Sequence, residues 1–86
     1  MNPATISMVE DLEEVRKTVE NLVRRSARFL WLEGYGNGEL ALQSIPGKTP
    51  DIVIMDINLP GISGIDCIKK LKPLCPETQY IMFTIY

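Results

Sequence analysis

A buried strand that ends in an acidic residue is the feature that most constrains this chain. Ile52–Met55 is an uninterrupted apolar run, which is typical of a strand covered on both faces of a parallel sheet. Asp56 follows directly, and the turn-forming residues of Pro60–Gly64 then lead into another ordered segment. Parallel α/β sheets keep their ligand crevice at the carboxyl ends of their strands. The stretch therefore predicts an α/β fold with a functional carboxylate at that edge.

The rest of the chain alternates between strand and helix patterns. We predict strands at 6–9, 27–33, 52–56 and 79–86, and helices at 12–26, 38–45 and about 62–71. Asn37 and Ser63 are the expected helix caps, and the turn residues Pro46–Pro50 are expected to break the second helix. An alternating order of this kind requires parallel strands joined by right-handed crossovers. The predicted fold class is thus α/β, a doubly wound parallel sheet in one domain.

Composition excludes several classes of function. The 86 residues carry a net charge of −2 with scattered lysines and arginines, so no direct contact with nucleic acid is expected. No apolar run is long enough to span a membrane, and the first residues do not resemble a signal peptide, so we expect a cytoplasmic protein without membrane contact. Cys67 and Cys75 lack any histidine partner for zinc and are expected to be reduced, packed thiols.

Four positions carry the expected chemistry. Glu10 and Asp11 follow the first predicted strand, and Asp56 follows the third. If those two strands are neighbours, the three carboxylates converge and repel one another unless a cation neutralises them. Oxygen ligands without nearby histidine or cysteine favour a hard ion such as Mg²⁺. A carboxylate is also a competent nucleophile toward phosphorus, so Asp56 is a candidate phosphoryl acceptor and Thr84 a candidate hydrogen-bonding hydroxyl beside it.

Each of these residues also has a plain structural interpretation. Asp11 followed three residues later by Glu14 has the spacing of a helix cap with an acidic third position. Glu10 alone could be a solvated strand end, Asn58 could form an Asx turn, and Thr84 could be an ordinary strand residue. Asp56 has the weakest structural explanation, because its strand is otherwise apolar. The placement of all these residues at strand ends favours a functional acidic site.

These motifs resemble the receiver domain of two-component response regulators. The resemblance rests on the acidic pair, the Asp-x-x-x-Pro-Gly-x-x-Gly signature and the late threonine. It implies a flavodoxin-like sheet of order 2-1-3-4 and a sensor histidine kinase as partner. It implies Asp56 as phosphoacceptor, Asp11 as a direct Mg²⁺ ligand and Glu10 as a ligand through water. Asn58 would offer its backbone carbonyl to the ion, and Thr84 the hydroxyl that senses the phosphoryl group. Receivers of this kind often precede a helix-turn-helix, DNA-binding output domain.

The sequence departs from that family after the fourth strand. A receiver has further helices and a fifth strand, and this strand carries a lysine that pairs with the phosphoryl group. Residues 1–86 match a partial receiver domain that lacks the fifth strand and the last helices. We therefore expect weakened Mg²⁺ binding and impaired phosphorylation. The apolar stretch 80–86 becomes an exposed edge, from which we expect self-association.

Two other classes of function remain open at this point. A phosphatase with an aspartyl nucleophile would place a second aspartate where this chain has Asn58. A docking module that works without phosphorylation would not depend on Asp56 at all. Replacing Asp56 by asparagine separates the docking module from the phosphorylated switch. In none of the favoured cases do we expect a free-standing enzyme.

Overall fold

Within residues 2–84, which the computed structural model describes, strands and helices alternate along the chain. The strands are β1 (Ala4–Val9), β2 (Phe29–Tyr35), β3 (Ile52–Asp56) and β4 (Gln79–Phe83). The helices are α1 (Glu13–Arg24), α2 (Gly38–Lys48) and α3 (Gly64–Leu71).

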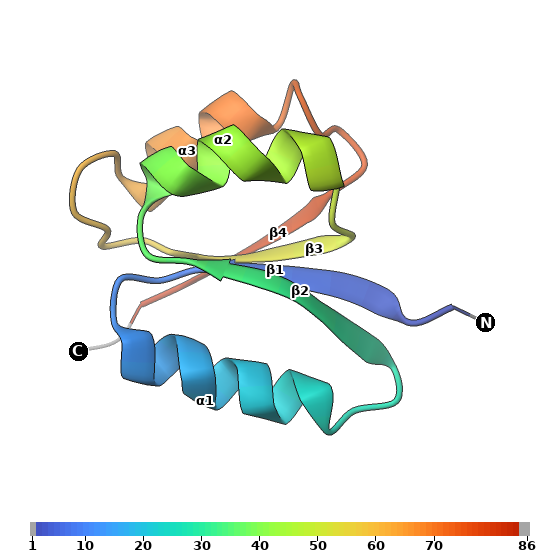
Figure 1. The fold of residues 1–86 in the computed structure, drawn as a ribbon. Helices are drawn as coiled ribbons and strands as arrows, with labels where there is room; N and C mark the ends of the chain where they lie inside the picture. The colour runs from blue at the N-terminus through green and yellow to red at the C-terminus, as the bar shows by residue number, and fades with distance from the viewer. Residues whose placement is uncertain (1, 85–86) are drawn as a thin grey trace.

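The strands form one parallel sheet in the order β2-β1-β3-β4. Helix α1 covers one face of the sheet, and α2 and α3 cover the other (Figure 1). Val9 of β1 is in register with Met55 of β3, and Asp56 of β3 with Phe83 of β4. The carboxyl ends of these three strands therefore lie together at one edge. This topology confirms the predicted fold class and strand order.

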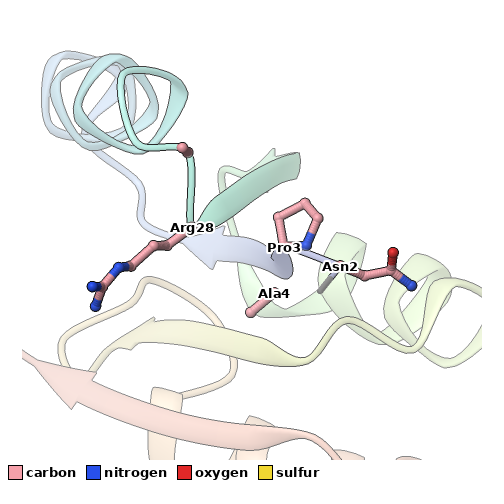
Figure 2. A pocket seen from close by; sticks show the side chains of 5 residues that line it. Asn2, Pro3, Ala4 and Arg28 are labelled. Atoms are coloured by element: carbon pink, nitrogen blue, oxygen red, sulfur yellow. The ribbon is translucent and has the colours of Figure 1, made fainter.

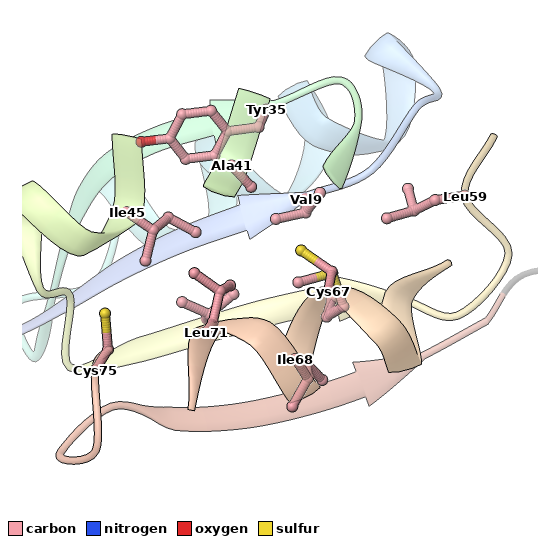
Figure 3. Packing of buried hydrophobic residues seen from close by; sticks show 11 residues of the cluster. Val9, Tyr35, Ala41, Ile45, Leu59, Cys67, Ile68, Leu71 and Cys75 are labelled. Carbon is pink, nitrogen blue, oxygen red and sulfur yellow. The ribbon is translucent and has the colours of Figure 1, made fainter. Parts of the chain in front are cut away.

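The face under α2 and α3 holds the larger part of the core. Its buried side chains come from the strands, from both helices and from the adjoining loops, and they point toward one another (Figure 3). The members are Val9, Tyr35, Ala41, Ile45, Val53, Met55, Leu59, Cys67, Ile68, Leu71 and Cys75. Both cysteines are free and buried, as the sequence predicted.

The face under α1 is covered less completely. The α1 side chains Val15, Val19 and Val23 lie on one face of the helix, but only Val23 is buried. Ile52 and Ile54 of β3 also face this side and remain half-buried. The prediction that β3 is buried on both faces is therefore right for one face only. The reason is that α1 packs mainly on β2, at the far side of the sheet.

The ranges of β2 and α2 differ from the predictions for local reasons. Strand β2 begins and ends two residues later than predicted, because the Ser26 hydroxyl accepts a hydrogen bond from the Arg28 amide at 3.2 Å and fixes a turn there. Helix α2 continues through Pro46 and ends at Lys48. A proline fits the helical φ angle and removes a single hydrogen bond, so a helix anchored by buried Ile45 can tolerate it.

Two of the predicted helix caps are confirmed and one is wrong. Asn37 accepts a hydrogen bond from the Leu40 amide at 2.8 Å, and Ser63 one from the Asp66 amide at 3.1 Å, so both predicted caps are confirmed. The proposed Asp11 cap is wrong, because α1 begins after Leu12 without a side-chain cap. The fourth strand ends at Phe83, and the last two residues of its predicted range lie outside the described residues.

Candidate functional site

Three carboxylates meet at the carboxyl edge of the sheet. One oxygen each from Glu10, Asp11 and Asp56 lies within 4.8 Å of the other two. Glu10 and Asp56 are buried and Asp11 is exposed. The adjacency of β1 and β3 produces this cluster, because each strand ends where its neighbour ends. The interpretation of Glu10 as a solvated strand end is wrong, since only 1% of its surface is exposed.

Glu10 has a strongly perturbed pKa. Its pKa is raised to about 7, mainly by burial and in part by the neighbouring acids Asp11 and Asp56, against the opposing effect of the Leu12 amide. That amide donates to Glu10 Oε2 at 2.9 Å. A buried carboxylate beside two other acids requires either a proton or a cation to offset the cost of its charge. The oxygen-only donor set and the partial exposure of the cluster fit a hard divalent cation.

Asn58 joins the acidic cluster to the end of β4. Its backbone amide donates to Asp56 Oδ1 at 3.0 Å, and its side-chain Nδ2 donates to the Thr84 hydroxyl at 2.8 Å. The Ile57 amide also donates to the Phe83 carbonyl at 3.0 Å, which keeps the two chain segments side by side. The Asx-type contact therefore belongs to the Asp56 side chain, and the Asn58 side chain instead makes a contact across the sheet. The sequence suggested an Asx turn at Asn58 and did not indicate its contact with Thr84.

The loop between β3 and α3 is held from two sides. Gly61 adopts a left-handed φ of 73°, which glycine accepts without strain. Next to it, the Ile62 amide donates to Glu39 Oε2 on α2 at 3.0 Å. Gly64 opens α3 directly against the backbone carbonyl of Asp56, where a Cβ atom would collide with the carbonyl oxygen. The glycine signature therefore serves close packing of α3 on the strand end as well as the turn.

The amino edge of the sheet has a hollow of a different character. It measures about 480 Å³ and is lined by Asn2, Pro3, Ala4, Ala27 and Arg28. Arg28 and Asn2 extend away from each other in Figure 2 and do not converge on a common point. No carboxylate lines this hollow. Among the described residues, the clustered carboxylates therefore lie at the opposite, carboxyl edge.

Comparison with known proteins identifies the family. A family model described as the response regulator receiver domain matches residues 6–86. This chain belongs to that family. The receiver domain is 32% identical over 82 residues to a protein-glutamate methylesterase/protein-glutamine glutaminase of Trichodesmium erythraeum strain IMS101, covering 92% of this chain and 22% of the relative. It is 32% identical over 79 residues to the transcriptional activator protein ExaE of Pseudomonas putida, covering 92% and 37%. The chain thus spans a minor part of each relative.

Solved structures share the fold of this receiver domain. A two-component response regulator of the LuxR family from Aurantimonas sp. SI85-9A1 superposes with a TM-score of 0.89 at 27% identity, covering 98% of this chain and 60% of that one. The response regulator TrrA from Thermotoga maritima, solved in complex with Mg²⁺-BeF, superposes with a TM-score of 0.86 at 26% identity, covering 96% and 70%. Family membership places this receiver domain in two-component signal transduction.

No helix in the described part of the receiver domain is both long enough and apolar enough to cross a lipid bilayer.

Proposed function

We propose that this receiver domain accepts a phosphoryl group on Asp56 from a sensor histidine kinase, in a step that requires Mg²⁺. The observation that carries the proposal is the convergence of Glu10, Asp11 and Asp56 within 4.8 Å of one another at the sheet edge. A carboxylate oxygen of Asp56 attacks phosphorus, the bond from phosphorus to the kinase imidazole breaks, and the imidazole leaves with a proton. The product is an acyl phosphate on Asp56.

The remaining residues are proposed to bind Mg²⁺ and to respond to the phosphoryl group on Asp56. Asp11 and Asp56 are proposed as direct Mg²⁺ ligands, Glu10 as a ligand through water and Asn58 as a ligand through its backbone carbonyl. When bound, the ion supplies positive charge that offsets the carboxylates and the phosphoryl oxygens. The Asn58 amide fixes Asp56 Oδ1 at 3.0 Å and so orients the carboxylate. Thr84, now hydrogen-bonded to Asn58 Nδ2, is the proposed hydroxyl that changes partner when Asp56 is modified.

We expect phosphorylation of the polypeptide 1–86 to be slow. In receivers a lysine pairs with the phosphoryl group, and among the described residues no lysine is paired with the acidic cluster. Lys48 forms an ion pair with Glu33 at 2.7 Å, and Lys69 and Lys70 lie in the last turn of α3, away from the strand ends. Without a cationic partner, the charge that develops on the transferring oxygens is less well stabilised.

The test is incubation with a small acyl phosphate donor, followed by intact-mass measurement. We expect a slow gain of one phosphoryl group that requires Mg²⁺ and is lost in Asp56→Asn. Asp66→Asn is the matched control, because Asp66 is exposed on α3 and should label as the wild type does. Labelling that persists in Asp56→Asn, or no Mg²⁺-dependent labelling of the wild type even after prolonged incubation, would contradict acceptance at Asp56. Full labelling within minutes would contradict the expected impairment.

Two alternatives make different predictions for the same variants. A phosphorylation-independent docking module would keep its partner binding in Asp56→Asn. A phosphatase with an aspartyl nucleophile needs a second carboxyl group for proton transfer, and Asn58 offers an amide that already donates to Thr84. The geometry therefore favours the phosphorylated switch over the phosphatase. We infer a cytoplasmic location, where such kinases present their phosphohistidine, and no turnover of a substrate by this domain.

We also propose partners for the protein as a whole. A DNA-binding output domain is proposed on the basis of relatives such as the transcriptional activator ExaE. In the polypeptide 1–86, self-association through β4 is proposed, because among the described residues β4 pairs only with β3 and exposes Ile81 and Met82. Sedimentation at tens of micromolar tests this. Ile81→Lys should reduce the association, and a monomeric wild type would exclude it.

A further inference from the structure

Arg16 of α1 reaches back over the loop that carries the acidic pair. Its Nη1 donates to the backbone carbonyl of Glu10 at 2.7 Å and, more loosely, to that of Asp11 at 3.5 Å. These two residues lie between the end of β1 and the start of α1, where the backbone carbonyls fall outside regular structure. The next carbonyl, that of Leu12, accepts the Arg16 backbone amide at 3.1 Å. The Arg16 side chain thus supplies a donor to two successive carbonyls of the loop, and the backbone bond to Leu12 is the ordinary first bond of the helix.

The neighbouring strand leaves room for this side chain. A Cβ atom on Gly34 would lie 3.2 Å from a Trp31 ring carbon and 3.3 Å from Arg16 Cδ, whereas one on Gly36 would be in ordinary contact with Arg16 Nη1 at 3.5 Å. Gly34 belongs to β2 and does not have a positive φ, so its backbone conformation does not require a glycine. A larger side chain at position 34 would crowd both the Trp31 ring and the stem of the arginine.

We propose that Arg16 is a positioning residue for the metal site, holding the loop so that the carboxylates of Glu10 and Asp11 face Asp56. This inference rests on the proposed Mg²⁺-dependent function. Arg16 touches backbone oxygens and none of the reacting groups, and it acts by fixing the direction in which the two side chains leave the backbone. Groups that orient metal ligands in this way commonly change metal affinity by at least about tenfold when they are removed.

A purely electrostatic role of Arg16 predicts the opposite result. A guanidinium near a cation site repels the cation, so on charge alone its removal would tighten Mg²⁺ binding. If Arg16 positions the loop, its removal weakens binding. The sign of the change in affinity therefore distinguishes the two roles.

The experiment measures Mg²⁺ affinity by calorimetry on the polypeptide 1–86 and three variants. Arg16→Ala should weaken binding about tenfold. Arg16→Lys keeps the positive charge but loses the planar guanidinium group, and should weaken Mg²⁺ binding by a smaller factor. Arg24→Ala is the matched control on the same helix, because Arg24 contacts Glu20 at 2.8 Å and not the loop, and should leave affinity unchanged. Unchanged or tighter binding in Arg16→Ala would overturn the proposal.

A second readout needs no metal. The Leu12 amide is held by Glu10 Oε2, so its hydrogen exchange reports the conformation of the loop. We expect this amide to exchange faster in Arg16→Ala, while amides of β3 exchange as in the wild type. Acceleration of all amides alike would indicate general destabilisation and would overturn a local role of Arg16. Unchanged Mg²⁺ affinity in a folded Arg16→Lys would overturn the proposal independently. If the wild type binds no Mg²⁺, or Asp11→Asn binds it equally well, the proposed function fails instead.

Discussion

The two faces of the sheet are built from the same four strands but reach different degrees of burial. Under α2 and α3, side chains such as Val53, Met55 and Leu71 are completely buried. Under α1, Ile52, Ile54 and Phe83 are only partly buried beside a single helix.

The difference follows from the number of helices on each face. Two helices cover the strands on one side, whereas α1 covers mainly β2 and leaves a hollow of about 410 Å³ between itself and β4. Apolar burial is a main source of folding free energy, so the closed face should contribute most of the stability of residues 2–84. It also carries the loop that places Asn58, so stability and site geometry depend on the same packing.

The strongest test of this difference compares one truncation on each face. Leu71→Ala removes a fully buried side chain beneath α3 and should lower the free energy of unfolding by about 3 kcal/mol. Val19→Ala, on the half-buried side of α1, should lower it by about 1 kcal/mol. Urea denaturation followed by circular dichroism measures both. Equal losses would mean that the open face is as well packed in solution as the closed one.

A smaller effect is expected where α3 meets the end of β3. Gly64→Ala places a Cβ atom against the Asp56 carbonyl oxygen, so the helix start must shift, at a cost of roughly 2 to 3 kcal/mol. Gly47→Ala is the control: a Cβ atom at position 47 would have no atom within 4 Å, and alanine favours a helix by up to about 1 kcal/mol. The measurement is the same denaturation series. A Gly64→Ala protein as stable as the wild type would show that the start of α3 can shift to accommodate the added Cβ atom without loss of stability.

The sequence predicted the parallel sheet and the acidic cluster because both follow from local patterns. The apolar run before Asp56 identifies a buried strand, and strand adjacency then brings Glu10 and Asp11 to the same edge. The predictions that were wrong depended on competition between neighbours. Asp11 has good capping spacing, yet its side chain belongs to the acidic cluster and Leu12 takes the cap position.

Other features depend on contacts that form only when the loops have folded, which sequence spacing does not reveal. Arg16 has the ordinary place of a charged residue on an amphipathic helix, and only the folded loop gives it the carbonyls of Glu10 and Asp11. Glu39 similarly looks like an acid in a first helical turn, but it holds the Ile62 amide across the loop. The Glu39 contact exists because α2 and the β3–α3 loop meet in the fold, whereas the Arg16 contact depends on the conformation that the adjacent β1–α1 loop adopts.

The smallest effect should appear as a dependence of stability on pH that originates in the closed face. Burial raises the pKa of Cys67 from 9.0 to about 11, with the charge of Glu39 adding to the rise. The folded state therefore keeps its proton where the unfolded state loses it. The contribution of this thiol is fully present below pH 9 and is lost as the pH rises toward 11, by at most roughly 2 kcal/mol.

The comparison of wild type with Cys67→Ala isolates this contribution. Cys75 and Tyr80, whose pKa values are also raised by burial, remain in both proteins and cancel in the difference. We expect the wild type to lose more unfolding free energy than Cys67→Ala between pH 8 and about pH 10.5, because only the wild type must keep this thiol protonated within the packed core. Parallel loss in the two proteins would show that the Cys67 thiol ionises in the folded state as easily as in the unfolded chain. The packing beneath α3 would then admit water, and the two faces would differ less than their exposed areas indicate.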